Sequence, residues 1–209
     1  MENHEITLPP GMAEVSSWEA FEACVGVLRG ENSSDLDTSP LLFRGHADSD
    51  WMLSTTLERR GRVQLNVGEY YRIVSSIKPE IETFTGNNWE NVPLDKIYET
   101  FFEYDPGSIA LSTGKLPSYD YLAHLRHQGF PSPLLDWTRS PYVAAFFAFN
   151  AAHRSERVSL YAYCERPNNI KGGGSDRPSI TSMGPRVKTH KRHFLQQSEY
   201  TFCAGFEDG

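Results

Sequence analysis

The stretch from His127 to Phe149 constrains the fold of this chain more than any other segment. It starts with a Gly/Pro-rich turn and a short apolar strand, and it continues through residues 136–140, Asp-Trp-Thr-Arg-Ser. A strongly apolar helix follows at once, because Ser140 is a good N-cap and Pro141 is favoured at the first helical position. We therefore predict a strand that delivers polar side chains to the start of a buried helix, a common support for a site.

The overall composition indicates one globular domain with a small extension. The 209 residues are 39% hydrophobic and 22% charged, which is ordinary for a soluble protein of this size. We divide the chain into an N-terminal helical extension, residues 1–39, and a catalytic domain, residues 40–209. The net charge of −7 argues against a general nucleic-acid coat but leaves a local basic patch open.

The three cysteines are far apart in the sequence and have no zinc-like spacing, which favours a reducing cytoplasm over a disulfide framework. The first residues lack the layout of a signal peptide, and no apolar run reaches membrane-spanning length. We therefore expect a cytoplasmic protein that uses neither a membrane nor a metal.

Hydrophobic periodicity predicts the remaining elements. Helical spacing predicts helices, besides the one at Pro141, over 18–30, 67–84, 94–104 and 118–127. Apolar or alternating runs predict strands at 41–43, 134–135, 158–163 and 199–202, whereas 168–184 is rich in Gly, Ser and Pro and is predicted to be a loop. The fold class that fits is α+β, with a small, split antiparallel sheet and flanking helices. Phe146, Phe147 and Phe149 are predicted to lie in its core.

Several motifs stand in a fixed order along the chain: Phe43-Arg44-Gly45, His127-x-Gly129-x-Pro131, and Leu134-Leu135-Asp136-Trp137-Thr138-x-Ser140-Pro141. Together they resemble the FRG-domain family, named for its Phe/Tyr-Arg-Gly motif and found mostly in bacteria and phages. The resemblance extends over residues 40–202, because Gln196-Gln197 with Tyr200-Thr201 fits the usual ending of the family. Two positions depart from the pattern: Ser132-Pro133 replaces the usual Thr-Arg, and Ser198-Glu199 replaces glycine and an apolar residue.

The order Arg44, then Thr138 and Ser140, then Gln197-x-Glu199 resembles the Arg–Ser/Thr–Glu signature of ADP-ribosyltransferases. The resemblance implies a fold like theirs and NAD as co-substrate. Arg44 would pair with the pyrophosphate, and Glu199 would stabilise the positive charge that develops on the ribose. Gln197 would contact the acceptor.

The full set of NAD-binding candidates comprises Arg44, Gly45, His46, Thr138, Ser140 and Tyr142. An aromatic wall for the nicotinamide is also expected, with Tyr142, Trp51 and Tyr119 as candidates.

The leading hypothesis is an ADP-ribosyltransferase that modifies a macromolecule and acts as a bacterial toxin or anti-phage defence effector. An antitoxin protein is an expected partner, because a toxic enzyme must be held inactive in its own cell. Lys188, Lys191 and Arg192 are candidate acceptor-binding residues beside the predicted catalytic strand. They slightly favour a nucleic acid, RNA for example, over protein as the acceptor.

Structural alternatives exist for these residues. Arg44 can form an ion pair with Asp136, Ser140 can serve only as a cap, Glu199 can be an exposed strand residue, and the basic cluster can be a solvated surface.

Two other functions also fit the sequence. One is an NAD-independent ribonuclease that uses His127, His46 or His193 with Arg44. The other is a non-catalytic module that binds a nucleotide or a partner.

Overall fold

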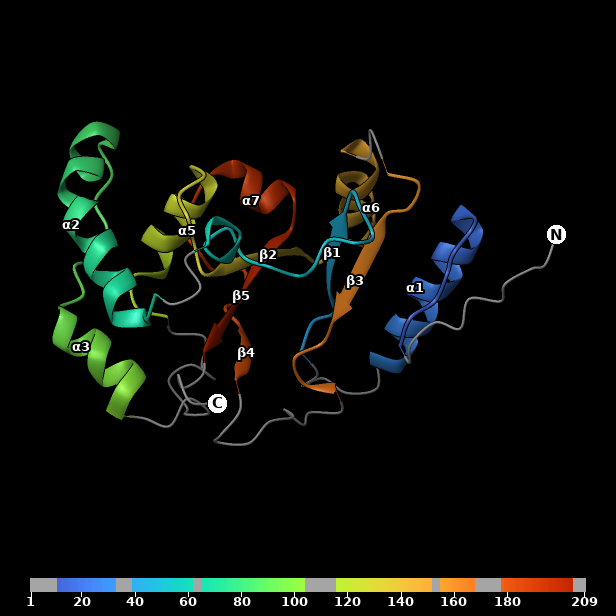
Figure 1. The fold of residues 1–209 in the computed structure, drawn as a ribbon, viewed down its shortest axis with the longest axis horizontal. Coiled ribbons are helices and arrows are strands. Elements are labelled where there is room, and N and C mark those ends of the chain that lie inside the picture. Colours follow the sequence, from blue (N-terminus) through green and yellow to red (C-terminus); the bar gives the residue numbers. More distant parts are fainter. Residues whose placement is uncertain are drawn as a thin grey trace.

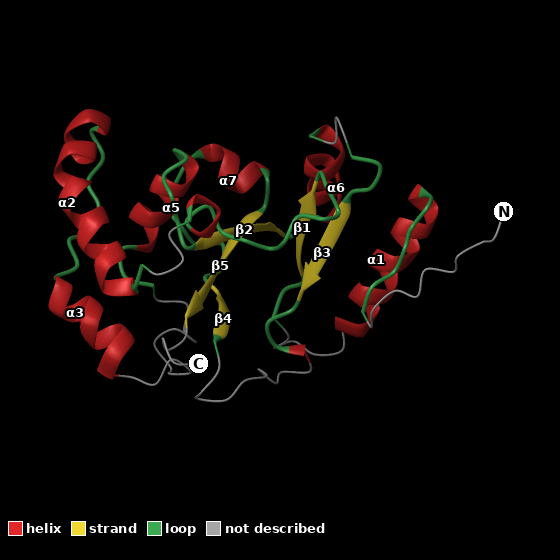
Figure 2. Cartoon of the chain, in the orientation of Figure 1, coloured by secondary structure: helices red, strands yellow, loops and turns green. Residues whose placement is uncertain are grey.

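A computed structural model of the chain describes residues 11–32, 39–61, 65–103, 116–151, 155–167 and 178–204. Helices and strands alternate irregularly along it, as Figures 1 and 2 show. In chain order the elements are α1 (Trp18–Asn32), β1 (Leu42–His46), the 3-10 turn η1 (Glu58–Arg60), α2 (Val67–Thr85), α3 (Leu94–Tyr98), the π-helical turn η2 (Glu99–Glu103), α5 (Tyr119–His127), β2 (Leu134–Thr138), α6 (Pro141–Asn150), β3 (Ser159–Tyr163), β4 (Ser179–Ser182), α7 (Lys191–Leu195) and β5 (Ser198–Ala204).

The strands form one open, antiparallel, five-stranded sheet in the order β3-β1-β2-β5-β4. β2 pairs with β5 along its whole length, and β1 pairs likewise with β3. Between β1 and β2, in contrast, the register consists of the single pair Phe43–Thr138, so the two halves of the sheet are joined at one point. The predicted α+β class is confirmed.

Helix α6 lies on the sheet with its alanines inward, and the prediction that its phenylalanines are core is wrong. Ala144, Ala145 and Ala148 are buried against β1, whereas the exposed fractions of Phe146, Phe147 and Phe149 are 60%, 43% and 62%. The reason is the close approach of the two backbones. A Cβ added to Gly45 of β1 would lie 2.0 Å from the carbonyl oxygen of Ala144, so only small side chains fit between them.

The main hydrophobic core lies at the other end of the sheet, between α2, α5 and β5. Figure 1 shows α2 and α3 at that end and α1 at the opposite end, beyond β3. Four buried tyrosines anchor this core, and three of their hydroxyls donate to backbone carbonyls: Tyr70 to Pro131 (3.1 Å), Tyr71 to Pro117 (2.7 Å) and Tyr121 to Val74 (2.9 Å). These bonds satisfy phenol groups that would otherwise be costly to bury.

Two elements near the site are not predicted by periodicity, namely β4 and α7. β4 occupies Ser179–Ser182 within the predicted 168–184 loop, of which residues 168–177 lie outside the described part. α7 and β4 are each too short to carry a recognisable hydrophobic period. None of the helices in the described ranges is both long and apolar enough to cross a lipid bilayer.

Candidate functional site

The three adjacent strands β1, β2 and β5 carry five of the predicted catalytic and NAD-binding residues, namely Arg44, Gly45, His46, Thr138 and Glu199, whereas Ser140 and Tyr142 belong to the start of α6 and Gln197 precedes β5. Phe43 of β1 pairs with Thr138 of β2, and Trp137 of β2 pairs with Glu199 of β5. Glu199 on β5 is thus separated from Arg44 on β1 by the strand β2. The guanidinium of Arg44 reaches Asp136, which precedes Trp137 on β2, and the charges nearest to it are those of Asp136, Arg59 and Arg126.

Glu199 is a buried, fully engaged carboxylate with an exposed fraction of 1%. Its Oε1 accepts a hydrogen bond from the Ser182 hydroxyl (2.5 Å), and its Oε2 accepts one from Nε of Arg139 (2.7 Å). The alternative that Glu199 is an exposed strand residue is therefore wrong. A buried carboxylate held by two donors on a rigid strand is a preorganised group of the kind that stabilises developing positive charge.

Arg44 is held in place by the chain, yet part of its guanidinium remains available. Its Nε donates to Nε2 of His46 (3.0 Å), and its Nη1 donates to the backbone carbonyl of Asp136 (2.7 Å). The other terminal nitrogen, Nη2, has no partner within the described chain and is not among its buried polar atoms. Burial lowers the pKa of this guanidinium, and the Asp136 carboxylate, 3.9 Å away, opposes the shift.

Asp136 links Arg44 to a second arginine. Its carboxylate forms a short ion pair with Arg126 of α5, whose side chain is as buried as that of Arg44. The ion pair between Arg44 and Asp136 that the sequence suggested as an alternative is therefore present, although Arg126 lies closer to Asp136 than Arg44 does. This network joins α5 to β2 near the point where β1 and β2 separate.

His46 is fixed as a neutral ring by its two neighbours. Its Nε2 accepts from Arg44, so its Nδ1 carries the proton and donates to the backbone carbonyl of Trp51 (3.2 Å). Burial, followed by the charge of Arg44, lowers the pKa of His46. Because both nitrogens are occupied, this histidine is a poor general acid or base.

Thr138 and Ser140 use their hydroxyls to organise the chain. The Thr138 hydroxyl donates to the carbonyl of Gln196 (2.7 Å) and accepts from the Ser140 backbone N–H (3.0 Å). The Ser140 hydroxyl caps α6 by accepting from the Val143 N–H (3.3 Å). Thr138 thus ties the end of β2 to the turn before β5, which fixes the position of Glu199.

The predicted aromatic candidates lie in three different surroundings. Tyr142 packs on α1, with its ring centroid 5.9 Å from that of Trp18. Tyr119 is half-buried, and its hydroxyl donates to the Gly184 carbonyl (3.0 Å). Trp51 is 52% exposed and lies beside His46, with 6.2 Å between ring centroids, so it is the exposed aromatic ring near Arg44.

Gln197 lines a pocket of about 200 Å³, together with Arg139, Pro185, His193, Phe194 and Ser198. Its φ of 48° is in the left-handed region, where a residue other than glycine is strained. The side chain is exposed and makes no hydrogen bond within the described chain. Strain next to Glu199 is consistent with a functional turn.

The other two histidines form a buried cluster with Tyr200. The Tyr200 hydroxyl and His127 Nε2 are 2.8 Å apart, and the His193 ring stacks on Tyr200 with centroids 5.8 Å apart. His193 Nε2 donates to the Pro185 carbonyl (3.1 Å), which leaves Nδ1 buried and unpartnered. This cluster packs α5 and α7 against β5, which is a structural task.

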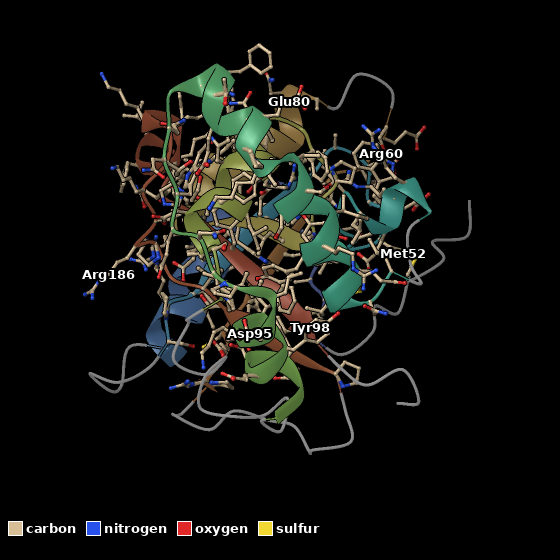
Figure 3. All side chains as sticks on the ribbon, turned by 90° about the vertical axis from the view of Figure 1, so that its left-hand side faces the viewer. Met52, Arg60, Glu80, Asp95, Tyr98 and Arg186 are labelled. Carbon is tan, nitrogen blue, oxygen red and sulfur yellow. The ribbon has the colours of Figure 1, made fainter. Side chains whose placement is uncertain are left out.

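The predicted acceptor-binding residues are on the surface, with Lys188 before α7 and Lys191 and Arg192 in its first turn. Lys188, Lys191 and Arg192 are exposed, and none of them forms an ion pair with a described acidic residue. Arg186 is exposed as well, and Figure 3 shows it at the edge of the molecule. The segment that carries them is anchored by the buried Val187, so the positive charges have a fixed backbone.

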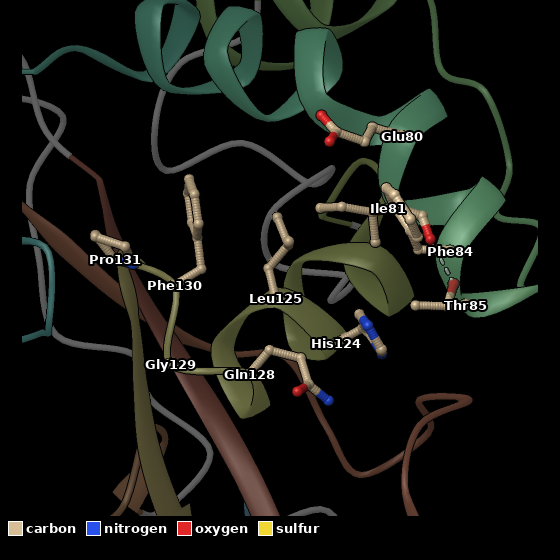
Figure 4. Close-up of a pocket in the computed structure, with 10 residues that line it drawn as sticks. All are labelled: Glu80, Ile81, Phe84, Thr85, His124, Leu125, Gln128, Gly129, Phe130 and Pro131. Atoms are coloured by element: carbon tan, nitrogen blue, oxygen red, sulfur yellow. Dashed lines mark hydrogen bonds between the residues drawn. The ribbon is translucent and has the colours of Figure 1, made fainter.

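The larger pocket described, about 550 Å³, lies away from all of these residues. It is between α2 and α5, where Phe84, Ile81 and Leu125 face one another (Figure 4). None of the predicted site residues lines it, so its size alone does not make it the site.

Arg139 and Ser182, which hold Glu199, were not predicted as site residues. Arg139 belongs to the polar run 136–140, and its position between a predicted strand and a predicted helix cap could have indicated a site residue. Ser182 had none, because the strand that carries it lies in a stretch with the composition of a loop.

A model of the FRG domain matches residues 39–157, more than half of the chain. The match includes the Phe43-Arg44-Gly45 motif and the whole run from Leu134 to Pro141, and it ends before β4 and β5. No curated protein and no solved structure matches the chain. The chain therefore belongs to the FRG-domain family.

Proposed function

We propose that this protein is an ADP-ribosyltransferase that transfers ADP-ribose from NAD to a macromolecule, with nucleic acid slightly favoured over protein as the acceptor. The observation that carries the proposal is Glu199, a buried carboxylate that Arg139 and Ser182 orient on β5, one strand away from Arg44 on β1. A cation on β1 and a carboxylate on β5 are the two charges that this chemistry requires.

In the proposed reaction, the bond between C1′ of the ribose and the nicotinamide nitrogen breaks, and its electron pair leaves with nicotinamide. A nucleophile of the acceptor forms a new bond to C1′ and loses its proton to solvent. Glu199 stabilises the positive charge that builds on the ribose, as carboxylates do in glycoside hydrolysis.

Arg44 would bind the pyrophosphate through Nη2, while its other nitrogens keep it aimed. Trp51, exposed beside His46, is the best placed aromatic ring to stack on a base or on nicotinamide. Thr138 and Ser140 act by positioning, since their hydroxyls already bond the backbone near Glu199 and at the start of α6.

The direct test supplies NAD labelled on its adenylate phosphate, together with total cellular RNA, DNA and protein as separate acceptors. We expect label in the nucleic acid, and a loss of about 100-fold or more in Glu199→Gln, as for other preorganised electrostatic groups. Glu22→Gln, an exposed change on α1, is the matched control and should keep full activity. Circular dichroism checks that the buried Glu199→Gln variant is folded.

Other outcomes of the same assay separate the rival functions. RNA cleavage without NAD indicates a ribonuclease, and nucleotide binding without nicotinamide release indicates a non-catalytic module. Label transfer that survives in folded Glu199→Gln overturns the role of Glu199.

We further propose that the protein acts as a bacterial toxin or defence effector, with an antitoxin protein as partner. The family membership and the proposed chemistry support this. Induced expression in bacteria should stop growth, and Glu199→Gln should relieve the arrest at equal protein level.

A further inference from the structure

The small pocket beside Glu199 combines an exposed aromatic ring with Arg139, and further cations lie on the chain segments that line it. Phe194 lines the pocket and is 61% exposed, although it is a large apolar side chain. Arg139 lines it too, and its two terminal nitrogens make no hydrogen bond within the described chain, because only Nε contacts Glu199. Exposed rings interleaved with positive charge are the mark of sites for single-stranded nucleic acid.

The positive charge around the pocket is not neutralised from within the described chain. Arg186, Lys188, Lys191 and Arg192 are exposed and form no ion pair there. Two acids contact this region, and both are occupied: Glu199 holds Arg139 and Ser182, and Asp120 accepts from the Lys188 backbone (3.0 Å). Such a local cluster is notable in a chain with a net charge of −7.

The geometry of α7 arranges the ring and the charges for a strand of nucleotides. Lys191 precedes Phe194 by three residues, so both lie on one side of the helix. The pocket volume of about 200 Å³ is below that of ordinary small-molecule sites, so it fits part of one nucleotide and not a whole dinucleotide. The pocket therefore suits part of the acceptor strand, and NAD would bind elsewhere, near Arg44.

We propose that this pocket binds single-stranded nucleic acid, with a base stacked on Phe194 and a backbone phosphate on the terminal nitrogens of Arg139. Lys191, Arg192 and their basic neighbours hold the adjoining phosphates. The inference rests on the proposed function in one respect, since it makes the bound strand the acceptor of ADP-ribose. A duplex is excluded from this mode, because its bases are stacked on each other and unavailable to Phe194.

Binding is tested first, without NAD. The full chain is titrated into a dye-labelled single-stranded RNA of about ten nucleotides, and into the same sequence as DNA and as duplex, and fluorescence anisotropy is followed. Phe194→Ala should weaken binding of the single strand about 5-fold or more, the usual effect of losing one stacking ring. Phe146→Ala on α6 is the matched control, because that phenylalanine is equally exposed (60%), and it should bind like wild type.

The charge contribution is read from salt dependence. Lys191→Gln combined with Arg192→Gln should lower the slope of log K against log salt by about 0.7 per lost phosphate contact. Equal affinity for duplex and single strand, or unchanged binding in Phe194→Ala, overturns the proposal.

Transfer of ADP-ribose is tested second. This experiment distinguishes a failure of the proposed transferase activity from a failure of the proposed binding pocket. Phe194→Ala should lose transfer of ADP-ribose to the single strand about 5-fold or more but keep nicotinamide release to water, because Phe194 takes no part in cleavage. Absence of nicotinamide release by wild type defeats the proposed function and leaves the binding result standing. Release with label only on protein defeats the nucleic-acid subsite and leaves the transferase standing.

Discussion

Two arginines flank the predicted site, and they differ in how they are held. The Arg44 side chain is 14% exposed, and two of its nitrogens bond to His46 and to the backbone of β2. The Arg139 side chain is 39% exposed, and a single nitrogen bonds, to Glu199. On the β1 side, the arginine is therefore held mainly by the folded chain itself. On the α7 side, the terminal nitrogens of Arg139 remain available to bind a ligand.

The largest expected effect tests how tightly the β1 side is packed. Gly45→Ala should lower the free energy of unfolding by about 3 kcal/mol or more, because the new Cβ would lie 2.0 Å from the Ala144 carbonyl. Chemical denaturation measures it. Gly26→Ala on α1 is the control: its Cβ meets nothing within 4 Å, so a slight gain in stability is expected. A neutral Gly45→Ala would mean that α6 is not fixed against β1.

The next effect concerns the charge network behind Arg44. Asp136→Ala should cost about 2–3 kcal/mol, because it leaves the buried guanidiniums of Arg44 and Arg126 without their carboxylate. Thermal and urea unfolding should agree on the loss. The exposed Asp50→Ala serves as the reference and should stay within about 0.5 kcal/mol of wild type.

The same substitution, arginine to lysine, at positions 44 and 139 compares the two arginines directly. Arg44→Lys should cost about 2 kcal/mol, because lysine cannot reproduce the bonds to both His46 and the Asp136 carbonyl. Arg139→Lys should cost about 1 kcal/mol, since one hydrogen bond is altered at a half-exposed position. Urea unfolding of the two variants side by side decides the matter, and equal losses would remove the distinction drawn between the two sides.

The smallest effect is a pH dependence to which one histidine on each side contributes, His46 on β1 and His127 on α5. Burial lowers the pKa of His46 and His127 below the unfolded value of about 6.5, so the unfolded chain binds more protons in this range. Stability is therefore fully present above pH 6.5 and falls as the pH decreases toward the folded pKa values. Melting curves from pH 7.5 to 5.5 should show the fall, and His46→Gln should make it shallower. A melting temperature that rises on acidification would contradict it.

Local sequence signals were sufficient for much of the scaffold. Ser140 with Pro141 predicted the start of α6, and the capping interaction is present. Apolar spacing predicted α2 and α5 closely, because each buries one face against the core. These features depend on residues within one or two helical turns of each other, which a sequence displays directly.

What could not be predicted depends on contacts between distant segments. Whether α6 packs its alanines or its phenylalanines against the sheet depends on the close approach of Gly45, about 100 residues earlier in the chain. Likewise, Ser182 and Arg139 become partners of Glu199 only through the pairing of β2, β4 and β5. Periodicity carries no information about such pairings.

The insertion of β5 between β2 and β4 also determines when the site exists during folding. Arg139 and Glu199 are 60 residues apart in sequence, and they meet only after β5 has docked along β2. Closing such a long loop is slow, and until it happens β2 keeps an unpaired edge. Glu199 therefore reaches its two partners only when β5 pairs with β2 and with β4, whereas the network of Arg44, Asp136 and Arg126 needs neither of the last two strands.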